Sequence, residues 1–264
     1  MNALFSIVLP QPDIYTIVLD SPVPLSLSSS VMGFESIRLI TFDCYGTLID
    51  WETGMLTALR PMFFQDGQTP ADARLLELYG DVEAELESGP YLPYRQVLSQ
   101  AVQEMGRRLG TAISEQQGAG FAQSFTQWKP FVDSVSALQS LATKFRLGII
   151  SNVDDDLFAE TRKMLPVDFA FVVTAQQVRS YKPAQGNFEE ALRRGGVDPY
   201  QVLHAGQSLY HDIAPANALG ISNVWVNRPS VRPGSGAARP AVATPSYEVH
   251  SLAELAELTG VSGS

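Results

Sequence analysis

The 264-residue sequence predicts an α/β fold, a doubly wound parallel sheet that carries an inserted helical cap domain. Three features of the sequence indicate this fold. Residues 37–42 have the composition of a buried strand, residues 55–128 show a helical pattern without any strand, and beyond Pro130 strands alternate with helices. Such alternation produces a parallel sheet with helices on both of its faces.

The first strand and the helical stretch have distinct patterns. Residues 37–42 are apolar apart from Arg38 and Thr41 and rich in β-branched side chains, which is typical of a buried strand. In residues 55–128, apolar side chains recur every three or four positions, as in an amphipathic helix. The clearest are Leu75, Leu76, Leu78, Tyr79, Val82 and Leu86, and then Val97, Leu98, Val102, Met105 and Leu109. Because the first strand has no neighbouring strand before residue 147, we interpret these helices as an insertion.

The remaining elements follow Pro130 in alternation. The expected strands are residues 147–150, 169–173, 202–205 and 223–226. The expected helices are residues 135–143, 155–165, 187–194 and 212–219. Residues 229–245 are rich in Pro, Ala, Gly and Ser and predict a surface loop, before a last helix at residues 252–258.

This pattern divides the chain into a core domain of residues 32–53 and 131–264 and a cap domain of residues 54–130. Residues 1–31 contain four prolines and no Lys or Arg. A secretory signal has a basic start and a continuous apolar run, and this segment has neither. We therefore expect residues 1–31 to be an ill-ordered extension of the core.

The composition limits the location and the partners of the protein. The 28 Asp and Glu outnumber the 18 Lys and Arg, so the net charge is −10, and no basic cluster favours nucleic acid or an anionic membrane. No apolar run approaches the roughly 18 residues of a membrane span. The single cysteine, Cys44, excludes an internal disulfide and a cysteine-based zinc site, and it favours a cytoplasmic location.

Polar side chains follow the expected strands at the points where these strands end. Ligands of open α/β sheets bind beyond the carboxyl ends of the strands. The polar residues at these ends are Asp43, Thr47, Ser151, Asn152, Lys182, Ser208 and Asp212. Two carboxylates, hydroxyl groups and a cation at one edge are the groups that nucleophilic displacement by a carboxylate requires.

These motifs, in this order, resemble those of the haloacid dehalogenase superfamily from Ile37 to the C-terminus. The helical stretch lies between the first and second motifs, as the cap domain of that superfamily does. The run Asp-x-Tyr-Gly-Thr at residues 43–47 is similar to the 2-haloacid dehalogenases in particular. The resemblance therefore implies a hydrolase that acts on small 2-haloacids without a cofactor or a metal, and it suggests a homodimer.

Two positions favour a dehalogenase over a phosphatase of the same superfamily. The phosphatases carry a second Asp two residues after the nucleophile, where this chain has Tyr45. A phenol with a pKa of about 10 does not readily protonate a leaving alkoxide, whereas chloride and bromide need no proton. Gln207 is neutral where the phosphatases commonly have an acid that helps to bind Mg²⁺. A Mg²⁺-dependent phosphatase of a small phosphate monoester remains the alternative.

The resemblance also implies roles for the individual residues. Asp43 attacks the carbon that carries the halogen and forms an ester, which water then hydrolyses to the 2-hydroxy acid. Lys182 keeps Asp43 ionised, and Asp212 orients or deprotonates the water. The expected substrate-binding residues are Tyr45, Thr47, Ser151, Asn152, Ser208 and Arg95.

The cap arginine that holds the substrate in that family has two candidates, Arg74 and Arg95. We favour Arg95 because it follows an aromatic turn that contains Tyr91 and Tyr94.

Two further classes of protein stay open. Residues 206–210 resemble a serine nucleophile elbow, but Tyr210 stands in place of the closing Gly. The second open class is a non-catalytic binding protein on the same scaffold. Among the histidines, His204 on an expected strand favours a hydrogen-bonded core position, and His211 is either a base, a halide contact or a structural residue.

Overall fold

The computed structural model of the protein describes residues 33–65, 67–229 and 236–261. The extension expected at residues 1–31 and the middle of the loop expected at 229–245 lie outside these described residues.

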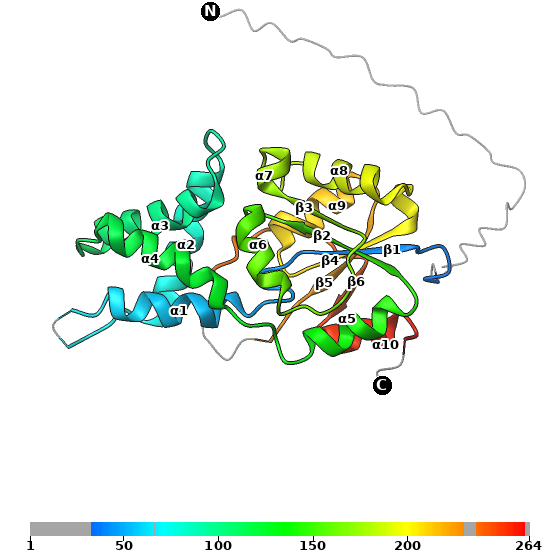
Figure 1. Ribbon diagram of the computed structural model, residues 1–264, viewed down its shortest axis with the longest axis horizontal. Coiled ribbons are helices and arrows are strands. Elements are labelled where there is room, and N and C mark those ends of the chain that lie inside the picture. Colours follow the sequence, from blue (N-terminus) through cyan, green and yellow to red (C-terminus); the bar gives the residue numbers. More distant parts are fainter. Residues whose placement is uncertain (1–32, 66, 230–235, 262–264) are drawn as a thin grey trace, which may run out of the picture. The chain divides into compact units, whose positions relative to one another are not determined.

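A six-stranded parallel sheet forms the centre of the structure, with the strand order β3-β2-β1-β4-β5-β6 (Figure 1). The strands are β1 (Leu39–Phe42), β2 (Arg146–Ser151), β3 (Phe171–Thr174), β4 (Val202–Gly206), β5 (Ser222–Val226) and β6 (Tyr247–Val249). The order reverses at β1, as it does in a doubly wound fold. The fold class predicted from the sequence is therefore confirmed. The short strand β6, which pairs with β5, was not predicted.

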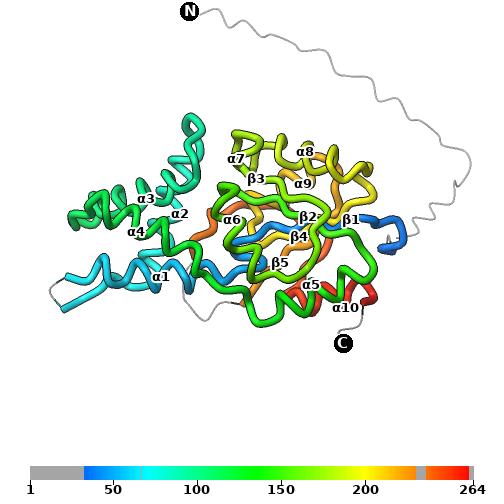
Figure 2. The backbone as a smooth tube through the Cα atoms, viewed as in Figure 1, coloured from blue at the N-terminus to red at the C-terminus, as the bar shows by residue number. Residues whose placement is uncertain are grey.

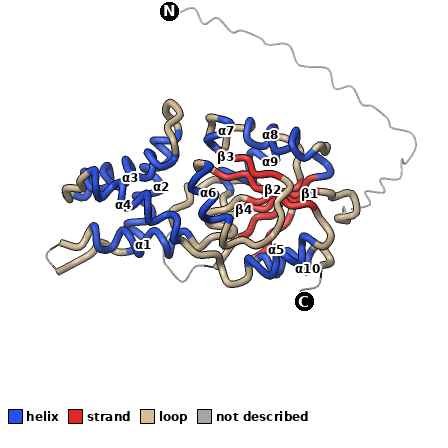
Figure 3. Tube along the Cα trace, viewed as in Figure 1, coloured by secondary structure: helices blue, strands red, loops and turns tan. Residues whose placement is uncertain are grey.

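Helices cover both faces of this sheet. Helices α7 (Ala175–Val178), α8 (Gly186–Gly195) and α9 (Ala214–Ala218) lie on one side, and α5 (Ser134–Ala142) and α10 (Leu252–Leu258) lie on the other (Figure 3). Successive residues of β1 point to opposite faces of the sheet. Leu39 packs with the first group of helices, and Ile40 packs with the core on the second side. Helix α6 (Asp155–Arg162) follows β2.

The inserted helices lie between β1 and β2 and form a group of their own in Figure 2. They are α1 (Trp51–Met62), α2 (Asp72–Glu87), α3 (Tyr94–Leu109), α4 (Glu115–Ser124) and the one-turn helix η1 (Phe125–Gln127). Ser114 and Gln117 form a capping box at the start of α4. None of the helices in the described part of the chain is long and apolar enough to cross a membrane.

The two chain segments that connect the inserted helices to the sheet run side by side. The backbone N–H of Asp50 donates to the carbonyl of Lys129 over 2.8 Å, and that of Phe131 donates to Leu48 over 3.0 Å. Helix α1 begins at Trp51, three residues before the boundary expected from the sequence. These backbone bonds hold the beginning and the end of the insertion at one place.

The predicted helix at residues 212–219 begins earlier and in a different form. A π-helical turn, η3 (Leu209–Ile213), precedes α9. The Ser208 hydroxyl accepts from the backbone N–H of His211 over 3.0 Å and caps this turn. The turn therefore begins directly after the edge of the sheet.

Two glycines of the inserted helices give a matched test of packing. A Cβ added to Gly54 in α1 would lie 2.3 Å from the Trp128 ring, whereas Gly120 in α4 has open space around it. Gly54→Ala should lower the free energy of unfolding by about 1–3 kcal/mol through overpacking. Gly120→Ala should raise it by about 0.5–1 kcal/mol, because alanine favours a helix. Urea unfolding of both variants measures the difference, and equal effects would contradict this packing of α1.

Candidate active site

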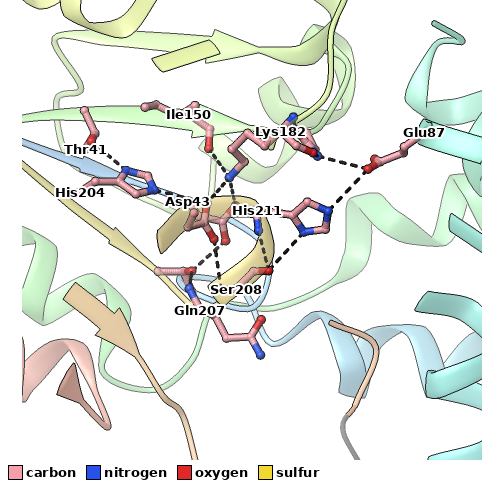
Figure 4. Close-up of polar contacts among 12 residues, drawn as sticks. Thr41, Asp43, Glu87, Ile150, Lys182, His204, Gln207, Ser208 and His211 are labelled. Atoms are coloured by element: carbon pink, nitrogen blue, oxygen red, sulfur yellow. Dashed lines mark hydrogen bonds and ion pairs between the residues drawn. The ribbon is translucent and has the colours of Figure 1, made fainter. Parts of the chain in front are cut away.

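The polar residues that follow the strands meet at the carboxyl edge of the sheet (Figure 4). Asp43 follows β1, Ser151 ends β2, and Ser208 lies two residues beyond β4. They line a cavity of about 50 Å³, whose other wall comes from α2 and α3 of the inserted helices. The cavity is large enough for only a few water molecules or a small substrate.

A buried ammonium occupies the centre of the site. Lys182 Nζ donates to Asp43 Oδ1 over 2.8 Å, to Asp212 Oδ1 over 2.6 Å and to the carbonyl of Ile150 over 3.0 Å. The side chain is 2% exposed. Asn152 holds the backbone of Lys182, since its side chain accepts from the Lys182 N–H and donates to the Lys182 carbonyl. All three protons of the ammonium are therefore in use.

The second oxygen of Asp43 is held by the loop that follows it. Thr47 Oγ1 donates to Asp43 Oδ2 over 2.8 Å and accepts from the backbone N–H of Gln207 over 2.9 Å. The loop turns at Gly46, whose φ of +95° favours glycine. Both carboxylate oxygens of Asp43 thus have a fixed partner.

Asp212 is held more tightly than Asp43. Its Oδ1 accepts from Lys182 and lies 3.3 Å from His204 Nε2, and its Oδ2 accepts from the backbone N–H of Ser208 over 3.2 Å. His204 is fully buried, and its Nδ1 contacts the Thr41 hydroxyl at 2.9 Å. A chain of hydrogen bonds therefore runs from Thr41 through His204 and Asp212 to Lys182.

Burial and charge act in opposite directions on these groups. Burial alone would lower the pKa of Lys182, but Asp212 and Asp43 outweigh it and hold that pKa above its ordinary value. Burial would raise the pKa of Asp212, but Lys182 and His204 reverse the effect and lower it. At Asp43 burial prevails over the attraction of Lys182, and the pKa is raised.

The hydroxyl of Tyr45 has its hydrogen-bond partner on helix α6. This hydroxyl hydrogen bonds to Thr161 Oγ1 of α6 at 2.8 Å, and the ring packs on Phe125. Burial raises the pKa of Tyr45 well above its ordinary value. The side chain lines the cavity as a ring and is a poor source of protons.

The structure does not bring Arg95 to the other expected residues. Its guanidinium pairs with Asp156 at 2.6 Å, and these side chains are 39% and 66% exposed. The neighbouring Tyr94 occupies the buried face of α3, so the next residue turns toward solvent. Arg74, the other candidate, is also exposed. Neither arginine lines the cavity.

The cavity contains residues that sequence reasoning did not select. These residues are Glu83 and Glu87, one helical turn apart on α2. A signal was present, because Glu83 follows Tyr79 at a spacing of four residues, on the apolar stripe of that helix. His211, which was open as a base or a structural residue, lines the cavity too.

Comparison with known proteins identifies the family. The family model of the haloacid dehalogenase-like hydrolases matches residues 37–220. The chain therefore belongs to the haloacid dehalogenase-like hydrolases, and the superfamily resemblance of the motifs is confirmed.

The curated relatives match only part of the chain. The Danio rerio haloacid dehalogenase-like hydrolase domain-containing protein 3 is 36% identical over 103 residues, which are 38% of this chain and 43% of the relative. A glyceraldehyde 3-phosphate phosphatase from Methanothermobacter thermautotrophicus is 37% identical over 106 residues, which are 39% of this chain and 47% of the relative. The chain thus spans less than half the length of these relatives.

Solved structures agree over a larger part of the chain. The L-2-haloacid dehalogenase from Xanthobacter autotrophicus with chloropropionic acid covalently bound has a TM-score of 0.71 at 20% identity. The match covers 85% of this chain and 98% of that one. The putative hydrolase YfnB from Bacillus subtilis bound to magnesium has a TM-score of 0.68 at 18% identity and covers 85% and 99%. At these identities the likeness shows the fold alone.

The residues at the site fit Mg²⁺ poorly. This ion prefers an octahedron of oxygen ligands, usually including carboxylates. Asp43 and Asp212 both accept a hydrogen bond from Lys182, and Gln207 offers a neutral amide. No cluster of three or more metal-binding side chains occurs in residues 33–65, 67–229 and 236–261.

The position of Asp212 depends on the absence of a side chain at Gly206. A Cβ added there would lie 2.4 Å from Asp212 Cγ, whereas one added to Gly186 meets nothing closer than 3.4 Å. If Asp212 positions Lys182 for catalysis, Gly206→Ala should lower kcat about 100-fold, since a shift of about 1 Å in an active site costs that much. Gly186→Ala is the control. Steady-state kinetics beside thermal melting checks the effect, and an active Gly206→Ala enzyme would contradict the role of Asp212.

Proposed function

We propose that the protein is a hydrolytic dehalogenase that converts small 2-haloacids to 2-hydroxy acids through an ester on Asp43. The proposal rests on the side chain found two residues after Asp43. Tyr45 stands there, its hydroxyl is hydrogen bonded to Thr161, and burial raises its pKa. The site suits a leaving group that departs as a stable anion without a proton.

In the first step a carboxylate oxygen of Asp43 attacks the carbon that bears the halogen, opposite the carbon–halogen bond. The new carbon–oxygen bond forms as the halide leaves with the bonding electron pair. Lys182 and Thr47 lower the pKa of Asp43 against the effect of its burial, and Thr47 fixes the orientation of the carboxylate. The product of this step is an ester of Asp43 and a free halide ion.

In the second step water attacks the carbonyl carbon of the ester, so Asp43 is regenerated and the hydroxy acid is released. Lys182 and Thr47 donate to the oxygens that gain negative charge. Asp212 has a lowered pKa and three donors around it, so its main role is to hold Lys182. His211 lines the same cavity, and burial lowers its pKa to about 4, so its imidazole is neutral. We assign it the transfer of a proton from the attacking water to the oxygen of the departing hydroxy acid.

A substrate panel tests this proposal. The enzyme should release halide from chloroacetate and 2-chloropropionate, and Asp43→Asn should lower this rate at least about 1,000-fold, because the nucleophile is lost. Asp81→Asn, an exposed position on α2, is the control and should keep the rate. Halide release by Asp43→Asn at the rate of the unchanged enzyme would contradict the ester mechanism.

A phosphatase is the second candidate, because one relative with 37% identity is a glyceraldehyde 3-phosphate phosphatase. With Tyr45 and Gln207 in place of acids, p-nitrophenyl phosphate should be hydrolysed at least about 100-fold more slowly than chloroacetate, with and without Mg²⁺. Both substrates are assayed side by side by colour and by halide release. Metal-dependent phosphate release without halide release would replace the dehalogenase by the phosphatase.

A further inference from the structure

Among the residues that the structure describes, no cation lining the cavity is free to bind a substrate carboxylate. The three protons of Lys182 are taken by Asp43, Asp212 and the Ile150 carbonyl. Among the described residues no arginine lines the cavity, and Arg95 pairs with Asp156 at the surface. Other hydrogen-bond donors must therefore hold the carboxylate of a 2-haloacid.

The wall opposite Lys182 carries two carboxyl groups. Glu83 is 7% exposed, and its Oε1 accepts from the hydroxyls of Tyr79 and Tyr94 over 2.9 and 2.7 Å. Glu87 Oε2 accepts from Asn152 over 3.3 Å and lies 3.9 Å from His211 Nε2 (Figure 4). No described residue donates to Glu83 Oε2 or Glu87 Oε1, so each group keeps one oxygen for another partner.

The net charge around the cavity determines whether Glu83 and Glu87 are ionised or protonated. Asp43, Asp212 and Lys182 together carry one net negative charge. Ionising Glu83 and Glu87 as well would put four carboxylates and one ammonium around about 50 Å³. Buried charges without partners are costly, and carboxyl groups in that position bind protons instead.

Burial favours the protonated form of both groups. Burial raises the pKa of Glu83 to about 7, against the hydrogen bonds from Tyr94 and Tyr79. Burial, and then the charge of Glu83, raise the pKa of Glu87 well above its ordinary value. A protonated carboxyl group donates a hydrogen bond, and a bond from O–H to a carboxylate is short and strong.

A second and independent feature of the same cavity also points to a ligand. Ser151 is 1% exposed and lines the cavity, and its hydroxyl has no hydrogen-bond partner among the described residues. Buried hydroxyls are nearly always hydrogen bonded, so the Ser151 hydroxyl is available to a group that binds in the cavity.

We propose that Glu83 and Glu87, as carboxylic acids, bind the carboxylate of the substrate together with the Ser151 hydroxyl. They take the place that the resemblance assigns to a cap arginine. This inference rests on the proposed function, because it assumes a substrate with a carboxylate beside the reacting carbon.

The titratable groups that face Glu83 and Glu87 decide which residues can cause a change of binding with pH. Tyr79 comes from α2 itself, Tyr94 from α3 and His211 from η3, while Tyr181 and Lys182 come from the segment before α8. The pKa of each tyrosine is raised above its ordinary value, and that of His211 is lowered to about 4. Lys182 stays charged, so none of these groups titrates near pH 7. Asp43 lines the same cavity and its pKa is also raised, so the assignment to the glutamates is made by comparing the unchanged enzyme with variants at positions 83 and 87.

The direction of the effect follows from which form donates. The acid forms bind the anion, so kcat/KM for chloroacetate should fall as pH rises through about 7, by up to about tenfold for each pH unit. The neutral 2-chloroacetamide should lack this alkaline limb. The double variant E83Q/E87Q keeps donors at every pH and should lose the limb for chloroacetate too. E85Q, at an exposed position of α2 that pairs with Arg108, should keep it.

Calorimetry with propionate, which carries no halogen, separates this inference from the dehalogenase proposal. Titrations at pH 8 in buffers of different ionisation enthalpy count the protons taken up with the ligand. The unchanged enzyme and E85Q should take up about one proton for each bound propionate, and E83Q/E87Q none. The inference would be overturned if propionate did not bind, or if it bound without proton uptake. Ethylammonium is the cation of matching size, and tighter binding of it would also overturn the inference. These outcomes hold whether or not any halide is released. Uptake without halide release would overturn the dehalogenase proposal alone.

Discussion

The buried ammonium of Lys182 joins the parts of the site that come from three different strands. It lies between Asp43 after β1 and Asp212 after β4, and it also binds the carbonyl of Ile150 in β2. A charge in such a place is stable only when its partners are complete, because the cost of desolvation is large. The parallel sheet supplies those partners, since the carboxyl ends of its strands meet at one edge. Removal of either carboxylate would leave the cation without enough compensation.

This arrangement has a consequence for the opposite wall of the cavity. The ammonium of Lys182, which is bonded to Asp43, Asp212 and the Ile150 carbonyl, has no proton left for a substrate. The wall formed by α2 brings Glu83 and Glu87 close to the two aspartates without bringing another cation. In our account the neutral form of these glutamates resolves the excess of negative charge and provides donors at the same time. The cavity then combines an ionised nucleophile with carboxylic acids, each kept in its state by its surroundings.

Much of the core site could be predicted from the sequence, because Asp43 and Ser151 lie at the ends of short apolar strands. The order of such strands along the chain is enough to bring their ends together. The wall formed by α2 could not be predicted in this way. Periodicity shows that Glu83 shares the stripe of Tyr79, but not that this stripe meets the sheet edge, which depends on tertiary packing. The same limit applies to Arg95, which is one residue from the buried Tyr94 and faces solvent.

Intermediate trapping tests the central claim, that Asp43 forms a covalent bond to carbon, most directly. A single turnover of chloroacetate with enzyme in excess in ¹⁸O water should place one heavy oxygen in the peptide that contains Asp43, and mass spectrometry of the digested enzyme detects it. The product of that first turnover should then carry none of the label, because its hydroxyl oxygen comes from Asp43. Heavy oxygen found in the product and not in Asp43 would mean that water attacks the carbon directly, and it would contradict the account.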